Sequence, residues 1–166
     1  MLANGEADAM KQFSRLRAVL VGGSIAGALD ILFALTHAAI NGMAPQRLLL
    51  VVASGLLGQD SYTGGWSTAL LGLVAHFALS LLWAALFVVA ATRLPRLVAK
   101  PALSGAIFGV LVFLAMRLVV LPLSEFPHPV SFKPLSAGLD LLSHVFFFGL
   151  PIALAAARAI RPREAS

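Results

Sequence analysis

The chain has 166 residues, of which 60% are hydrophobic and 11% are charged, with a formal net charge of +5 and a mean hydropathy of +0.94. Soluble domains carry a much larger share of charged residues, so this composition excludes an ordinary soluble protein and predicts a membrane protein. The chain has no cysteine, which excludes disulfides, thiolate metal sites and thiol redox chemistry.

Four apolar segments reach the length of about 20 residues that a helix needs to cross a bilayer core of about 30 Å. They cover residues 18–40, 69–91, 103–121 and 138–157. The sequence therefore predicts an all-α, polytopic membrane protein, a four-transmembrane-helix bundle within residues 18–157. We expect residues 1–17 and 158–166 to form an N-terminal and a C-terminal tail.

The first segment is expected to be a retained span and not a signal peptide, because acidic residues precede it and Asp30 interrupts it. It ends where Asn41, Gly42 and Pro45 disfavour a helix. The apolar stretch that follows, residues 45–58, is too short to cross the bilayer. It predicts a short interfacial or re-entrant helix after the first span.

Prolines interrupt the last two spans. The third span is expected to stop at Pro122, after which "PLSEFPHPVSFKP" predicts a stiff, extended segment that covers the outer side. Pro151 lies inside the fourth span, where it is expected to kink the helix and free a backbone carbonyl.

The basic residues are distributed unevenly among the loops. Nine of the twelve Lys and Arg residues precede the first span, join the second to the third, or follow the fourth. Only Arg47 and Lys133 lie in the opposite loops, and Arg117 lies within the third span. The positive-inside rule therefore predicts that both termini lie in the cytoplasm. The basic charge reflects this topology, so the lipid bilayer and not nucleic acid is the expected partner.

Small and polar residues follow one another at steps of three and four in the spans, which is typical of helix faces that pack against other helices. The glycines of these faces are Gly23, Gly27, Gly72, Gly105 and Gly109. Ionisable residues lie on or beside the same faces and gather in the outer half of the bundle, so we expect one outward-facing polar site shielded from lipid. The predicted site comprises Asp30, His37, His76, Arg117, Asp140 and His144.

Three classes of function are compatible with this site. Histidine titrates near neutral pH, which favours a non-enzymatic protein that senses or passes protons or a small ion. His37, His76 and His144 are candidate ligands of a metal or of haem in a redox or enzyme subunit, although no metal-ligand spacing is present. The third class is a structural partner in a larger membrane complex, held together by interhelical hydrogen bonds. The small size of the bundle makes a homo-oligomer plausible.

Three stretches resemble bacterial inner-membrane proteins described only as uncharacterised: "SGLLGQDSYTGGWSTALLGLVAHF" from residue 54, "GAIFGVLVFLAMRLVVLPLS" from residue 105 and "SHVFFFGLPIALAAAR" from residue 143. More distantly, the order of a His in span two, a Gly-rich span three ending in proline, a Pro-rich outer loop and a His in span four resembles the YagU-like family. This resemblance implies an inner-membrane protein that helps cells at low pH, with His76 and His144 at the matching positions. The chain departs from the pattern at Arg117, where the family is expected to carry a histidine and where a fixed charge cannot titrate.

Overall fold

Helices make up almost all of the protein. The computed structural model describes residues 2–160, with side chains from Ser14 onward, and no strand occurs in this part of the chain. The two single-helix spans are α1 (Leu2–Ile40) and α3 (Gly65–Arg93). The other two spans are composite, because each consists of three consecutive helical elements. The third span comprises α5 (Pro101–Ala115), η2 (Met116–Val120) and α6 (Leu121–Leu123). The fourth span comprises α7 (Pro134–Ser143), η3 (His144–Gly149) and α8 (Leu150–Ile160). The connecting elements are α2 (Pro45–Leu57), η1 (Gly58–Thr63) and α4 (Arg96–Ala99).

Four helices of the described part are long and apolar enough to cross a membrane. They are Ser14–Ile40, Gly65–Arg93, Pro101–Leu123 and Pro134–Ile160. Large apolar side chains remain exposed on each of them, for example Leu32, Leu70, Leu111 and Phe146. Such a surface is unfavourable in water and suits contact with lipid. The all-α class and the four apolar helices predicted from the sequence are confirmed.

Helix α1 begins well before the apolar segment that the sequence singles out. Residues 2–17, which we expected to form a tail, continue the helix. Most residues of this stretch are Ala, Leu, Met, Glu, Gln, Lys or Arg, which have high helix propensity and favour continuation of the helix. Of the expected C-terminal tail, 158–160 complete α8, and 161–166 lie outside the described residues.

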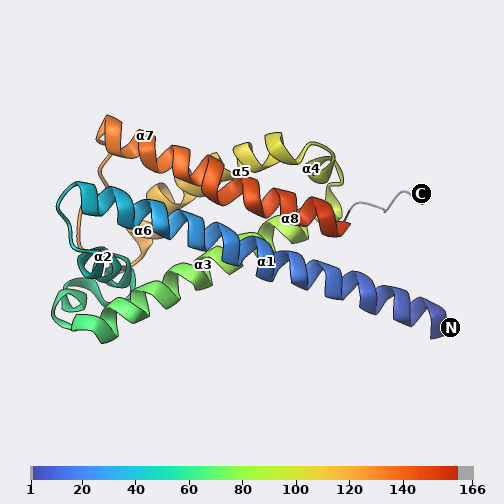
Figure 1. Cartoon of the computed structure of the whole chain (residues 1–166), viewed down its shortest axis with the longest axis horizontal. Helices are drawn as coiled ribbons and strands as arrows, with labels where there is room; N and C mark the ends of the chain where they lie inside the picture. The colour runs from blue at the N-terminus through green and yellow to red at the C-terminus, as the bar shows by residue number, and fades with distance from the viewer. Residues whose placement is uncertain (1, 161–166) are drawn as a thin grey trace.

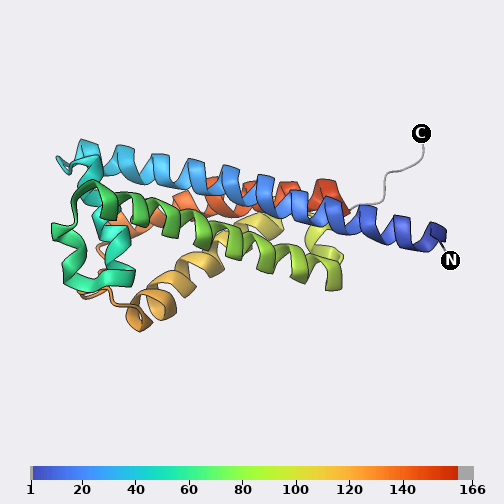
Figure 2. The ribbon, with the colours of Figure 1, turned by 90° about the horizontal axis from the view of Figure 1, so that it is seen from below.

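Helix α1 lies between α3 and α8 and packs against both (Figure 1). The third span packs against the fourth, through contacts of α5 with η3 and α8. Helices α3 and α5 meet where the rings of Phe87 and Trp83 contact Phe108, with centroid distances of 4.9 and 6.3 Å. Beyond that point the third span turns away from α3, and α2 lies between their ends (Figure 2). The start of α1 and the end of α8 lie at the end of the bundle that carries α4 (Figure 1).

Glycines allow the closest helix approaches. A Cβ at Gly23 would lie 3.1 Å from the Cβ of Ala84 on α3, and Gly27 faces Phe77 and Ser80 of the same helix. Between the third and fourth spans, Gly109 faces the carbonyl group of His144 so closely that a side chain would overlap it. Close backbone approach gains dispersion contacts, which is how helices associate in lipid.

Both composite spans contain a π-helical turn just before a proline. η2 precedes Pro122, and η3 precedes Pro151. A proline lacks the N–H that the helix needs, and its ring clashes with the carbonyl group four residues earlier. Widening the helix by one residue relieves this clash, and such π-bulges occur often at functional sites. Here the two π-turns contain Arg117 and His144.

Candidate functional site

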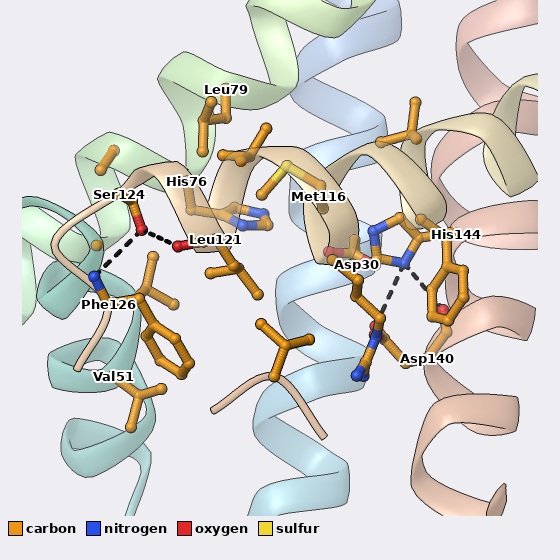
Figure 3. A pocket seen from close by; sticks show the side chains of 18 of the residues that line it. Asp30, Val51, His76, Leu79, Met116, Leu121, Ser124, Phe126, Asp140 and His144 are labelled. Atoms are coloured by element: carbon orange, nitrogen blue, oxygen red, sulfur yellow. Dashed lines mark hydrogen bonds and ion pairs between the residues drawn. The ribbon is translucent and has the colours of Figure 1, made fainter. Parts of the chain in front are cut away.

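A pocket opens between α3 and the third span, at the end of the bundle opposite the chain termini. Its volume is about 860 Å³, and most of its lining side chains are apolar. Helix α2 and residues 124–133 line it at the end of the bundle, and Asp30 of α1 lies in its wall. Figure 3 shows the side chains of Asp30, His76 and His144 converging on this space from three helices.

Asp30 is held by a serine from the fourth span. The hydroxyl of Ser143 donates a hydrogen bond of 2.6 Å to Oδ1 of Asp30. Ser143 is 2% exposed, so this bond is made away from water. No Lys or Arg among the described side chains forms an ion pair with Asp30. Asp30 is close enough to His144 for an electrostatic interaction.

Arg117 is clamped by the fourth span and by the segment before it. Its Nε and Nη2 donate hydrogen bonds of 3.1 and 2.8 Å to Oδ2 of Asp140, and its Nη1 donates to the carbonyl of Ser131. The guanidinium also lies over the rings of Phe113 and Phe132, at 5.1 and 5.4 Å from their centroids. Its charge is therefore compensated by Asp140, and its hydrogen-bonding capacity is largely used.

Each pocket histidine has one ring nitrogen bonded to a backbone carbonyl. Nε2 of His76 donates to the carbonyl of Gly27 over 2.9 Å, and Nδ1 of His144 donates to the carbonyl of Asp140 over 2.9 Å. Nδ1 of His144 also lies 3.3 Å from Oδ1 of Asp140. Because a carbonyl oxygen only accepts, these bonds place a proton on the bonded nitrogen. Within the described part of the protein, no hydrogen bond involves the second nitrogen of either ring.

Trp83 adds a polar group to the apolar wall. It lines the pocket, and its indole N–H is buried without a hydrogen-bond partner in the described part of the protein. Buried N–H groups are nearly always paired, so this donor is an exception that a molecule in the pocket could satisfy.

The structure brings together five of the six residues of the predicted polar site. Asp30, His76, Arg117, Asp140 and His144 all line the pocket.

His37 does not line the pocket: its ring stacks on Phe33, and its Nε2 lies 3.4 Å from Nδ2 of Asn41. It lies on nearly the same face of α1 as Asp30, but seven residues of helix carry it about 10 Å further along the axis. The face was therefore readable from the sequence, whereas the depth of the pocket was not.

The three histidines proposed as metal ligands are not gathered. Within the described residues, no group of three His, Asp or Glu side chains is arranged to hold a metal ion. His76 and His144 are instead hydrogen-bonded to backbone carbonyls of α1 and α7, respectively.

The lid segment, the extended residues 124–133, is tied to α2 and η1. The backbone N–H of Glu125 donates to the carbonyl of Gly55 over 3.1 Å. The hydroxyl of Tyr62 lies 3.0 Å from Nε2 of His128, and the guanidinium of Arg47 lies 4.1 Å above the Tyr62 ring. These contacts hold the segment against one end of the pocket.

Sequence reasoning missed several groups of the site. Ser143 directly precedes His144, but nothing in its neighbourhood indicates a bond to Asp30. The carbonyl of Ser131 and the ring of Phe132 come from the proline-rich segment, whose path depends on tertiary contacts. The sequence contains one indication that α2 lines the pocket: its apolar stretch is too short to cross the bilayer.

The chain was also compared with protein families, curated proteins and solved structures. No family model, no curated protein and no solved structure matches it.

Proposed function

We propose that this protein is a multi-pass bacterial inner-membrane protein whose pocket takes up and releases protons at Asp30, His76 and His144. The observation that carries the proposal is the arrangement of the two histidines. Each has one nitrogen fixed on a backbone carbonyl, and each lines a pocket shared with a carboxylate that has no Lys or Arg partner among the described side chains. Histidine is the side chain type whose ordinary pKa lies closest to neutral pH, and an ionisable group inside a membrane protein is by default a functional one.

The ion pair of Arg117 and Asp140 has a different role in this proposal. A guanidinium does not deprotonate in proteins, so Arg117 supplies a fixed charge. Its bonds to Asp140 and Ser131 join the third span to the fourth and to the lid segment. The pair thereby holds the pocket open beside the titrating groups.

The expected orientation places the pocket toward the outside. Basic residues gather at the predicted cytoplasmic end. Arg15 and Arg17 lie in the first turns of the first span, Arg93 ends the second span, and Arg96 and Lys100 lie between the second span and the third. The pocket and its lid segment then lie on the side where pH varies most. This agrees with the acid-related role that resemblance to the YagU-like family implies, and that role is part of the proposal.

The test is to follow the four histidines of the purified protein in lipid nanodiscs by ¹⁵N NMR from about pH 5 to pH 8. We expect His76 and His144 to titrate, and Asp30→Asn to displace the titration of His144 because the two groups interact electrostatically. His37 lies outside the pocket and is the internal control, which Asp30→Asn should leave unchanged. Constant tautomer signals for His76 and His144 across this range would refute the proposal.

A further inference from the structure

The pocket is far larger than a proton or a metal ion needs. A volume of about 860 Å³ with mostly apolar walls falls in the range of sites that bind organic molecules. A hydrated ion would lose its water against such walls without gaining ligands, because the described residues form no group of three metal-binding side chains.

The charges in the pocket favour a cation. Of the acidic side chains that line it, Asp140 is compensated by Arg117, whereas Asp30 is bonded, among the described side chains, only to the hydroxyl of Ser143. Lys133 also lines the pocket, but its side chain is exposed at the end of the bundle and forms no ion pair with Asp30. An anion would meet the uncompensated carboxylate of Asp30 and a guanidinium that is already bonded. A neutral molecule would leave a proton as the only means of neutralising Asp30 and would gain nothing from its charge. A monovalent cation neutralises that charge.

Aromatic rings add to this preference. Phe113, Phe126, Phe148 and Trp83 line the same pocket as Asp30. Ring faces attract cations, most strongly when water is excluded, and they also bury the apolar groups of an organic cation. The ring of Phe113 already lies under the guanidinium of Arg117, and Phe148 is buried. Trp83 and Phe126 are therefore the rings best placed to contact a ligand beside the carboxylate of Asp30.

The pocket is open on the side that faces lipid. Ala78 and Leu82 of α3 line it and are exposed, with Leu82 53% exposed. Figure 2 shows that the third span and α3 diverge toward the end of the bundle that carries α2. A lipid-soluble molecule can reach Asp30 sideways from the bilayer, while α2 and the lid segment cover the end.

We infer that the pocket binds a lipophilic organic cation, which enters between α3 and the third span and replaces the proton on Asp30. This inference rests on the proposed function, because it uses the protonation of Asp30. When the cation binds, the proton leaves the carboxyl group for water; when a proton returns, the cation loses its counter-ion. The ionisable groups that share the pocket with Asp30 are His76 from α3, Arg117 from η2, Lys133 just before α7, Asp140 from α7 and His144 from η3. Protonation of either histidine acts in the same direction as protonation of Asp30, because it repels the cation.

The experiment measures binding of tetraphenylphosphonium by fluorescence of Trp83 in nanodiscs. The chain has two tryptophans, and Trp66, which is 70% exposed, is replaced by Phe to leave Trp83 alone in the pocket. Tetraphenylborate, an anion of nearly the same size and shape, is the matched probe. Asp30→Asn removes the charge, Asp30→Glu keeps it, and His37→Gln is the control outside the pocket.

We expect saturable quenching by tetraphenylphosphonium that weakens by at least about tenfold in Asp30→Asn and weakens as the pH falls, the tenfold being equivalent to about 1.4 kcal/mol. Asp30→Glu and His37→Gln should retain binding, and tetraphenylborate should quench without saturation. Thermal unfolding of each variant verifies that it is folded. Asp30→Glu then distinguishes loss of charge from loss of structure.

Three results would overturn the inference. Equal affinity for the two probes, or for wild type and Asp30→Asn, would show that charge at Asp30 does not select the ligand. Absence of saturable quenching while His76 and His144 titrate would overturn the inference and leave the proposed function standing. Saturable binding that is independent of pH would show that the cation does not exchange with a proton on Asp30. That result would contradict the proposed function as well as the inference.

Discussion

Ser143 donates a hydrogen bond of 2.6 Å to the carboxylate of Asp30, a residue 113 positions earlier in the chain. The bond joins the first span to the fourth next to the pocket. It explains how an apolar helix can carry an aspartate, because the side chain meets a buried hydroxyl and a cavity and does not face lipid.

Replacement of this serine should weaken the bundle measurably. We expect Ser143→Ala to lower the free energy of unfolding by roughly 0.6–2 kcal/mol, the range for interhelical hydrogen bonds in membranes. The measurement is equilibrium unfolding in mixed micelles. Ser24→Ala, at an exposed position of the same bundle, is the control and should change stability little. Equal effects of the two substitutions would show that the bond to Asp30 contributes nothing.

The pair of Arg117 and Asp140 is expected to behave as a coupled unit. Arg117→Met leaves the Asp140 carboxylate without its guanidinium, and we expect a loss of roughly 1–3 kcal/mol in the free energy of unfolding. Asp140 is 38% exposed, so water compensates part of the cost and keeps it within this range. The double variant Arg117→Met/Asp140→Leu should recover part of the loss in a double-mutant cycle. Strictly additive effects would contradict the pairing.

Two glycines in comparable helices offer a matched test of packing. Gly109 faces the backbone of His144, where a methyl group has no room, whereas Gly138 on α7 has no atom within 4 Å of the place its Cβ would occupy. We expect Gly109→Ala to lower the free energy of unfolding by about 1–3 kcal/mol. Gly138→Ala should be neutral or stabilising by up to about 1 kcal/mol, because alanine favours helix. The reverse order would refute the close approach of α5 to η3.

The proposed orientation can be tested by labelling, because the chain has no cysteine of its own. We expect a membrane-impermeant maleimide to label Lys133→Cys in intact spheroplasts and Arg96→Cys only in inverted vesicles. The two positions lie at the start of α7 and at the start of α4, at opposite ends of the bundle. Labelling of Arg96→Cys from outside would invert the orientation and place the pocket toward the cytoplasm.

The sequence predicts much of the helical framework because its signals are local. Apolar length indicates the four spans, and Asn41 and Gly42 mark the end of α1. Steps of three and four residues indicate the packing faces, since they depend only on the helical period. Asp30, His76 and His144 could be assigned to one polar site by that reasoning.

What depends on tertiary geometry was not predictable. The π-turns at Arg117 and His144 arise from how each helix accommodates a proline, and the sequence marks the proline but not the form of the response. The pocket exists because α3 and the third span diverge, and no local pattern encodes that divergence. The extent of the pocket along α1 depends on this divergence, so the sequence could not show that His37, on the same face as Asp30, lies beyond the pocket.

The central claim, that Asp30 exchanges protons within the pocket, is tested most directly by infrared difference spectroscopy of the protein in nanodiscs. Spectra recorded at about pH 5 and pH 8 are compared for wild type, Asp30→Asn and Asp140→Asn. We expect a protonated-carboxyl band that grows at low pH in wild type and in Asp140→Asn and is clearly weaker in Asp30→Asn, where only the other acidic residues contribute. An equally strong band in Asp30→Asn, or a wild-type carboxyl region that does not change with pH, would contradict the claim.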